Sequence, residues 1–329
     1  MPAGKFFFYV LLIVSLASCQ AVAIEKIPNA TMQPTKTLPA IPTSTTKKPI
    51  LSSITPEVTQ TPVAEIEHCA EEMCILDGHF LLDNPISDFG EKFTDNTYRF
   101  GSTQGGRRET HHGVEFPNKE GIPVLAVAPG VVVFAGSDKG STLAWVPNFY
   151  GNVVVIRHEL KGISQPVYTL YGHLSKIAVD IGQKIDEGKM IGAVGATGTA
   201  LGSHLHFEVR YAINQYSNVM NPVLWVKPLP GFGVIAGSVR DADGYFLPAE
   251  LNMQKIEEGV TNPAPYTSIL TYENKILPVL GDNTYQENFA AGDLPVGKYR
   301  VSVVLNQKVE EQVIEIQDGK LTYLTFVVD

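Results

Sequence analysis

Short apolar runs separated by glycine and proline dominate the middle of the chain. They are rich in Val and Ile and bounded by turn residues, a pattern that predicts strands rather than amphipathic helices. Repeated turns of this kind are typical of a compact antiparallel β domain, which we expect over residues 80–228. The five strands predicted there are Pro123–Ala128, Gly130–Ala135, Asn152–His158, Pro166–Leu170 and Ser203–Arg210.

A second β region follows Pro228. Residues 237–244 predict a strand that leads into a turn, residues 298–303 alternate polar and apolar side chains, and residues 321–328 predict a further strand. Several strands within about a hundred residues predict a small β-sandwich over residues 232–329. The predicted fold class is therefore all-β.

The first twenty residues carry an apolar run, Phe6–Leu16, directly after Lys5. This run is shorter than the ~20 residues of a spanning helix, so it predicts the core of a signal peptide. The following residues, up to Cys19, resemble a bacterial lipobox. That resemblance implies a lipoprotein signal over residues 1–19, export, and attachment of the lipidated Cys19 to a membrane bilayer, with the protein facing the cell envelope or exterior. An ordinary signal peptide with an incidental cysteine is the alternative.

Residues 20–65 are rich in Pro, Thr, Ser and Lys and contain no aromatic residue. Such a composition cannot bury enough apolar surface to offset ordering the backbone, so it predicts a disordered tether. The following segment, residues 66–79, contains Cys69 and Cys74. Export would favour a disulfide between these two cysteines, although their spacing also permits free thiols. A metal role is disfavoured because no second cysteine pair exists.

The charge of the chain narrows its partners. The 329 residues carry a formal net charge of -9 and no cluster of Lys or Arg on a repeating face. We therefore expect no nucleic-acid partner.

Histidine gives the candidate chemistry. Five of the eight histidines fall in three short blocks, at residues 111–115, 171–175 and 203–207. Alternate residues of a strand share a face, so His204 and His206 would point the same way, as would His111 and Glu115. Two imidazoles and a carboxylate, with a fourth position for water, make a tetrahedral zinc site, so the sequence predicts a metal-dependent hydrolase.

The strand at 203–210 has two chemically different faces. Leu205, Phe207 and Val209 would pack into the core, while His204, His206 and Glu208 would line the other face. Glu208 is a candidate for fixing the tautomer of a ligand histidine, and a structural salt bridge is the alternative.

The histidine blocks resemble the lysostaphin-type (LytM-like) zinc metallopeptidases, whose motif is His-x-x-x-Asp followed later by His-x-His. The resemblance covers about residues 96–225 and includes Tyr-Gly-His-Leu-Ser, a glycine-rich approach at 192–198 and His-Leu-His-Phe-Glu-Val-Arg. It implies a zinc endopeptidase that cleaves peptides of bacterial peptidoglycan. The implied zinc ligands are His111, Glu115 and His206, and the implied catalytic residues are His173 and His204.

The second β region resembles carboxypeptidase regulatory-like (prealbumin-like) domains. The likeness rests on Gly-Ser-Val-Arg-Asp-Ala-Asp-Gly at 237–244 and on the segment 293–299. It implies no catalytic residues.

Glu115 departs from the family pattern, which has aspartate there. Glutamate offers zinc the same carboxylate, but its additional methylene must be accommodated by rotamer or backbone. Three alternatives stay open: a degenerate site without metal that binds wall or regulates an amidase, a scaffold lipoprotein with the sandwich as its working module, and a register in which His112 is the ligand.

In the favoured case, zinc would lower the pKa of water toward ~7 and polarise the scissile carbonyl. His204 would accept or orient the water proton, and His173 would stabilise the oxyanion or protonate the leaving amine, but the sequence does not assign these roles uniquely. Residues 98–101 and 105–108 would form a wall of the cleft, with arginines for substrate carboxylates, or a solvated loop. Residues 145–150 would form a groove rim or a hydrophobic cap.

Overall fold

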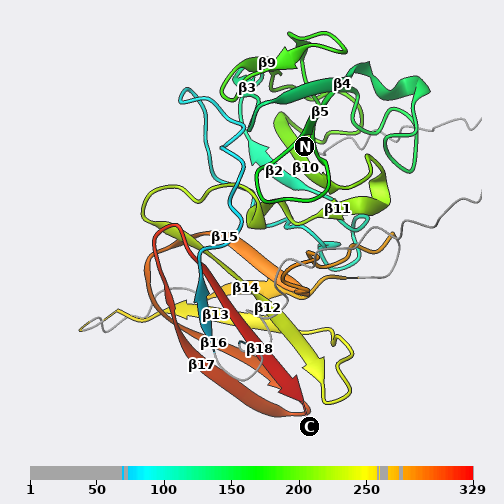
Figure 1. Ribbon diagram of the computed structural model, residues 1–329. Helices are drawn as coiled ribbons and strands as arrows, with labels where there is room; N and C mark the ends of the chain where they lie inside the picture. Colours follow the sequence, from blue (N-terminus) through cyan, green and yellow to red (C-terminus); the bar gives the residue numbers. More distant parts are fainter. Residues whose placement is uncertain (1–68, 70–72, 258, 260–265, 274–276, 329) are drawn as a thin grey trace, which may run out of the picture. The chain divides into compact units, whose positions relative to one another are not determined.

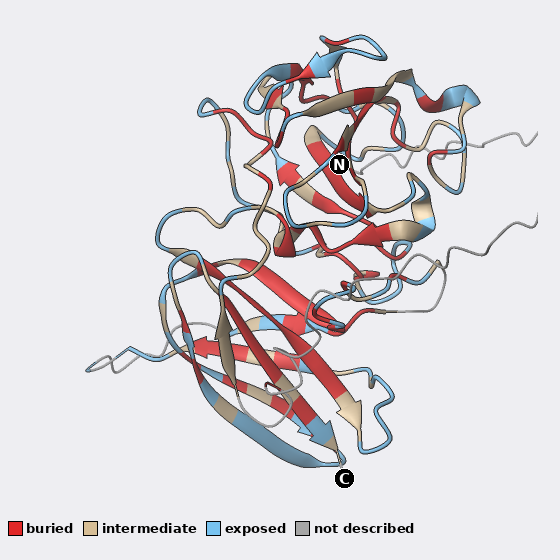
Figure 2. Ribbon diagram, in the orientation of Figure 1, coloured by how far each residue is buried: buried red, intermediate tan, exposed pale blue. Residues whose placement is uncertain are grey.

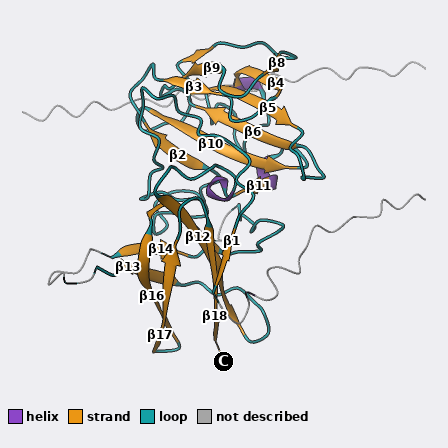
Figure 3. Ribbon diagram, turned by 60° about the vertical axis from the view of Figure 1, so that its left-hand side comes forward, coloured by secondary structure: helices purple, strands orange, loops and turns teal. Residues whose placement is uncertain are grey.

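The computed structural model describes residue 69 and residues 73–257, 259, 266–273 and 277–328. The prediction of an all-β fold is confirmed, because the described residues form strands, loops and only three-residue 3-10 turns (Figure 3). These turns are η2 (Asp138–Gly140), η3 (Tyr216–Asn218) and η4 (Pro222–Leu224). Within the described residues, no helix is long and apolar enough to cross a membrane.

A seven-stranded sheet forms the centre of the first β region, and all its strand pairs are antiparallel, as predicted (Figure 1). On one side β10 pairs with β6. On its other side it pairs with β2 and then with β11. In spatial order the strands are β11 (Val219–Met220), β10 (His204–Tyr211), β6 (Val167–Gly172), β5 (Asn152–His158), β4 (Gly130–Ser137) and β8 (Lys184–Ile185), with β2 (Val114–Pro117) beside β10.

A three-stranded antiparallel sheet accompanies it. Its order is β3 (Pro123–Leu125), β9 (Met190–Ala193) and β7 (Lys176–Ile177). All five predicted strands of this region are present. β5 has the predicted bounds, whereas β3 ends three residues early, at Leu125, after a register shift between Val124 and Leu125.

Strand β10 is buried on both faces. On one face Leu205, Phe207 and Val209 are fully buried in the hydrophobic core, as predicted from the alternation. The other face carries His206, Glu208 and Arg210, which are also buried. A polar strand face that is withdrawn from water must find its partners inside the protein, and this face is where the candidate site lies.

The second β region is a sandwich of two four-stranded sheets, as predicted (Figure 1). Side chains of both sheets share one hydrophobic core, which contains Ile235 and Leu324 from the first sheet and Met253 and Val301 from the second. Within the first sheet β12 and β18 are parallel. The first sheet has the order β1 (Cys74–Leu76), β18 (Leu321–Val328), β12 (Phe232–Asp241), β15 (Phe289–Pro295), and the second β14 (Thr267–Leu270), β13 (Glu250–Lys255), β16 (Gly297–Leu305), β17 (Lys308–Ile316).

The cysteine-containing segment joins this sandwich. Cys69 and Cys74 form a disulfide with an S–S distance of 2.08 Å, and β1 pairs with β18 over three residues. The predicted signal peptide with Cys19 and the predicted tether at 20–65 lie outside the described residues. Buried positions follow the strands, whereas much of β17 is exposed (Figure 2).

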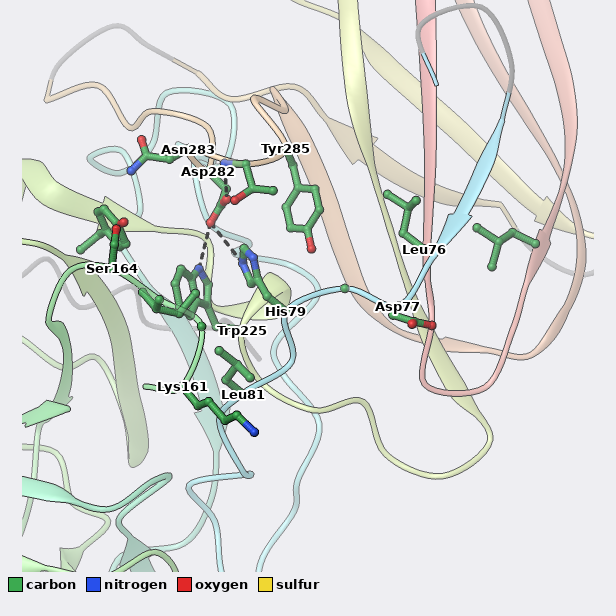
Figure 4. Close-up of a pocket in the computed structure, with 16 residues that line it drawn as sticks. Leu76, Asp77, His79, Leu81, Lys161, Ser164, Trp225, Asp282, Asn283 and Tyr285 are labelled. Carbon is green, nitrogen blue, oxygen red and sulfur yellow. Dashed lines mark hydrogen bonds and ion pairs between the residues drawn. The ribbon is translucent and has the colours of Figure 1, made fainter. Parts of the chain in front are cut away.

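Side chains from both β regions share a polar cluster (Figure 4). The Asp282 carboxylate accepts a hydrogen bond from the Trp225 indole at 3.0 Å and lies 3.3 Å from the His79 imidazole. The hydrophobic core that buries Leu205 and Phe207 of β10 also contains Trp225 together with Ala236 and Tyr323 of the sandwich. The domain boundary near residues 228–232 stays a prediction.

Candidate metal centre

Strand register brings the two distant histidine blocks together. In the antiparallel pair of β2 and β10, Glu115 is the direct partner of His206. On the other side of β10, Gly172 is the partner of His206. Facing residues of neighbouring strands lie about 5 Å apart, so this register places Glu115 against the His206 ring.

Three side chains converge here in the combination that the sequence predicts. The ligand-capable atoms of His111, Glu115 and His206 all lie within 4.8 Å of one another. Glu115 Oε1 is 3.1 Å from His111 Nε2 and 3.2 Å from His206 Nδ1, and these two nitrogens are 3.4 Å apart. The three groups form a small triangle of two nitrogens and one oxygen.

The dimensions and chemistry of this triangle fit a tetrahedral cation. Zinc bonds of about 2.0–2.1 Å to nitrogen and oxygen place neighbouring ligand atoms of a tetrahedron about 3.3–3.4 Å apart. The three separations of 3.1, 3.2 and 3.4 Å are close to that spacing. Two imidazoles and one carboxylate also form a donor set that zinc accepts with a fourth position left open.

Hydrogen bonds on the far sides of both rings orient the ligand nitrogens. His111 Nδ1 lies 2.8 Å from the Tyr98 carbonyl, so a proton on Nδ1 leaves the Nε2 lone pair for the triangle. The Tyr98 ring stacks on His111 at 4.0 Å and 4°. His206 Nε2 lies 3.1 Å from Glu208 Oε1, which likewise leaves Nδ1 for the triangle.

Glycine provides the room that the His206 ring needs. A Cβ added to Gly113 would lie 2.5 Å from the Phe207 carbonyl and 2.9 Å from the His206 ring. Real side chains do not approach so closely, so any other residue at 113 would displace the ligand strand or its imidazole. Gly113, between the first two candidate ligands, is thus part of the site.

A buried ionic network supports His206. Glu208 and Arg210 are both fully buried, with Arg210 Nη2 2.7 Å from Glu208 Oε2, and the Tyr150 hydroxyl also donates to Glu208. Burial alone would raise the pKa of Glu208, but Arg210 and His206 lower it to about 2. Glu208 is therefore an ionised acceptor for His206 across the neutral range, and it makes both contacts considered from the sequence, one to the ligand histidine and one salt bridge to Arg210.

The charges of the triangle are strongly coupled. Burial alone would raise the pKa of Glu115, but hydrogen bonds from the three surrounding histidines hold it well below its usual range. Burial alone would lower the pKa of His206, but Glu115 and Glu208 raise it to about 9. A cation at the triangle would replace the proton that His206 holds between these two carboxylates.

His173 and His204 lie beside the triangle. Their ring centroids are 4.8 Å apart, and the His173 ring is 5.7 Å from that of His206. His204 Nε2 contacts Glu115 Oε2, while its Nδ1 lies 2.8 Å from the Gly202 carbonyl. His173, in the left-handed region at φ 61°, places Nδ1 2.8 Å from the Thr197 carbonyl.

The two histidines differ in their electrostatic environment. Burial, with the neighbouring His206 and His204, lowers the pKa of His173 to about 3. His173 is thus neutral near pH 7, with its Nε2 lone pair free of the Thr197 contact. His204 Nε2 instead lies against the Glu115 carboxylate.

The remaining sequence candidates lie around a groove of about 430 Å³. It is lined by the triangle and the two further histidines and by Tyr98, Arg108, Trp145 and Phe149. Both segments that were candidate groove walls thus reach the site. His112 does not join the triangle; its ring stacks on Tyr216 at 3.9 Å and lines the same groove. His158 contacts the Pro129 carbonyl and Thr169 within the core and has no place in the groove.

Comparison with known proteins agrees with this geometry. Residues 109–222 match the sequence model of peptidase family M23. The chain contains an M23 peptidase domain. This M23 domain spans the triangle and both neighbouring histidines.

Three similar proteins illustrate the range of the match. The DD-carboxypeptidase/endopeptidase Mpg of Neisseria meningitidis serogroup B is 39% identical over 120 residues, which are 36% of this chain and 24% of that protein. The glycyl-glycine endopeptidase ALE-1 of Staphylococcus capitis is 32% identical over 137 residues, 41% of this chain and 34% of that protein. The solved catalytic domain of lysostaphin from Staphylococcus simulans is 30% identical, covers 34% of this chain and 76% of its own, and has a TM-score of 0.30.

The match thus spans about a quarter of the length of the Mpg protein. The roles of His111, Glu115 and His206 as ligands and of His173 and His204 in catalysis stay predictions.

Proposed function

We propose that the M23 domain is a zinc-dependent endopeptidase that hydrolyses peptide bonds of bacterial peptidoglycan. The observation that carries this proposal is the triangle of His111 Nε2, Glu115 Oε1 and His206 Nδ1, with each histidine oriented by a hydrogen bond on its far side. The substrate class is supported by the activities of similar proteins, among them a peptidoglycan DD-endopeptidase of Vibrio cholerae.

In this proposal His111, Glu115 and His206 hold the zinc ion. When bound, zinc supplies a Lewis acid that polarises a carbonyl and lowers the pKa of water. Glu208, kept ionised by Arg210, holds the His206 ring in place through its Nε2.

The two further histidines divide the proton transfers. His173 has its Nε2 lone pair free of the Thr197 contact, and this geometry supports a role as general base at that atom. His204 places Nε2 against the Glu115 carboxylate, a hydrogen-bond acceptor, and this contact supports a role as donor to the developing oxyanion or the leaving amine. These assignments choose between alternatives that the sequence leaves open.

Charged residues of the groove suit a peptide substrate. Arg108 lies over the Tyr98 ring with its guanidinium 4.7 Å from the ring centre, and both residues line the groove. A guanidinium held on an aromatic face can bind a carboxylate in a bidentate manner. Arg108 would therefore recognise a carboxylate of the substrate peptide.

We place the protein outside the cytoplasm, attached to a bacterial membrane through lipidated Cys19. The apolar run followed by a lipobox-like sequence supports this. Export would bring the M23 domain to its proposed substrate.

The decisive experiment measures zinc content and cleavage on the same preparations. The natural chain should bind about one zinc per molecule and release soluble peptide fragments from purified cell wall. His206→Ala should lose both properties, whereas His204→Ala should keep zinc and lose about 10²–10⁴ in cleavage rate. Zinc binding without wall cleavage by the natural chain would contradict the proposal.

One observation favours a second candidate, a wall-binding or amidase-regulating protein without metal: glutamate stands at position 115 where the family motif has aspartate. Zinc titration of Glu115→Asp separates the two. If only the Asp variant binds zinc, the natural chain is the regulator; if both bind, the shorter carboxylate is not required.

A further inference from the structure

A second hollow adjoins the active-site groove. It encloses about 880 Å³ and shares His112, Trp145 and Tyr216 with that groove. The His112 ring stacks on Tyr216 at 3.9 Å, and both rings line both hollows, so the two hollows meet at these residues. A substrate that occupies the groove would therefore extend directly into this second hollow.

Both β regions build this hollow. One wall is the loop after β4, with Thr142 and Leu143, and another is the chain around Gln215 after β10. The sandwich contributes Pro278 and Leu280 from the connection between β14 and β15. The M23 domain alone would lack this last wall.

The two hollows differ in charge. The groove is lined by Arg108, Glu109 and Glu115 besides its histidines, as suits a peptide with charged groups. No Asp, Glu, Lys or Arg is among the described residues that line the second hollow. A charged group placed there would find no oppositely charged side chain among these lining residues, so this lining favours an uncharged part of a ligand.

Aromatic and aliphatic side chains line the second hollow beside hydroxyl and amide groups. Trp145 is 51% exposed and lines this hollow, so part of its indole is accessible to a ligand. Thr142, Gln215 and Ser217 provide uncharged donors and acceptors around it. The combination fits a pyranose ring, which offers an apolar C–H face for stacking and hydroxyl or acetamido groups at its edge.

We propose that this hollow is a subsite for an N-acetylated amino sugar of the glycan strand whose peptide lies in the neighbouring groove. The inference rests on the proposed function for its substrate, and it adds that the sandwich takes part in substrate recognition. An uncharged sugar next to a charged peptide matches the change in polarity from one hollow to the other.

Direct binding tests the subsite without cleavage. The chain has two tryptophans, and Trp225 is only 2% exposed, so a saturable fluorescence change with N,N'-diacetylchitobiose would report on Trp145. The full chain should show this change. Leu280→Glu and Gln215→Glu, one from each β region, should weaken it by about three- to tenfold, because each places a carboxylate without a partner beside the sugar.

Val313→Glu is the matched control, because Val313 is 57% exposed on β17 and does not line the hollow. It should bind chitobiose as the natural chain does. Thermal melts of all three variants check their folding. Absence of a saturable change in the natural chain, or equal binding by all variants, would overturn the subsite.

Cleavage kinetics provide a second test of the sugar subsite. A cross-linked peptide dimer that carries its disaccharide should have a KM about three- to tenfold below that of the same dimer without sugar. Leu280→Glu should remove this difference while keeping the kcat of the sugar-free dimer. Equal KM values for both substrates in the natural chain would refute the proposal. If neither dimer is cut but Leu280→Glu loses chitobiose binding, the sugar subsite stands and the endopeptidase proposal falls.

Discussion

Strands β10 and β16 show how one alternating pattern serves two purposes. Each strand alternates polar and apolar residues and lies between neighbours in an antiparallel ladder. On β16 the polar face, with Lys298 and Arg300, is exposed. On β10 the polar face, with Glu208 and Arg210, is covered by the rest of the M23 domain. A polar face that has lost its water must be paired inside, and here that pairing holds a candidate metal ligand in place.

Two buried carboxylates extend this comparison. Glu208 has Arg210 beside it, and its pKa falls to about 2. Glu287, in the sandwich, is equally buried, but its neighbours are the Tyr272 hydroxyl and the acidic Asp282. Burial, with the charge of Asp282, raises the pKa of Glu287 to about 8. The cationic partner, rather than burial, decides which carboxylate is ionised at neutral pH.

The largest expected effect comes from the buried arginine. Arg210→Ala should cost about 3–5 kcal/mol of unfolding free energy, because it leaves the fully buried Glu208 charge without its partner. Arg300→Ala, which removes the half-exposed pair with Glu311, should cost less than about 1 kcal/mol. Urea denaturation of both variants measures the contrast, and equal losses would remove the distinction between the two strand faces.

Replacement of Glu287, the buried carboxylate without a cationic partner, should change the pH dependence of stability. The folded-state pKa of Glu287 is about 8, above the ordinary value of 4.5, so its protonated form stabilises the fold and that contribution declines as pH rises from about 4.5 to 8. Glu287→Gln should therefore gain up to a few kcal/mol over the natural chain on going from pH 5 to pH 8.5, at about 1.4 kcal/mol per pKa unit.

Thermal or urea denaturation at both pH values measures the effect of Glu287→Gln. A difference between variant and natural chain that does not change with pH would show that Glu287 does not titrate in this window.

Metal should stabilise the first β region. Zinc at about 100 times its Kd should raise the unfolding free energy by about 2.7 kcal/mol, and a chelator should reverse this. Glu115→Gln should lose most of the gain, because an amide cannot supply the anionic ligand. Differential scanning calorimetry with and without zinc measures this gain in both proteins. A zinc-induced rise in melting temperature of the same size in Glu115→Gln would place the ion elsewhere.

The smallest effect is expected on the exposed face of the sandwich. Val313→Thr on β17 should change the unfolding free energy by less than about 0.5 kcal/mol, since Val313 is 57% exposed. A loss of several kcal/mol in urea denaturation would mean that this strand is covered in solution.

The parts of the fold that were predicted from sequence share a local signal. The β10 alternation predicted both faces of that strand, and the Val-rich run of β5 gave its bounds. Strand β15 was not predicted, because Gly292 and Asp293 within it are turn formers, and Asp293 indeed adopts a φ of 58°. Strand β17 was also missed, since Glu310, Glu311 and Gln312 interrupt its apolar pattern.

The candidate site, like the fold, was predicted from sequence only in part. Residue types and strand parity predicted the grouping of His111, Glu115 and His206. Their supports depend on contacts between segments far apart in the chain: the Tyr98 carbonyl behind His111, the Tyr150 hydroxyl on Glu208, and the space left by Gly113. No local pattern carries such information, because each partner is chosen by the tertiary fold.

The pairing of β1 with β18 has a mechanical consequence. A pull on the chain ahead of Cys69 acts first on the Cys69–Cys74 disulfide. It then acts on the three residue pairs that hold Cys74–Leu76 against β18. Load applied ahead of Cys69 is thus passed to β18, whereas Glu115 on β2 and His206 on β10 lie in another sheet.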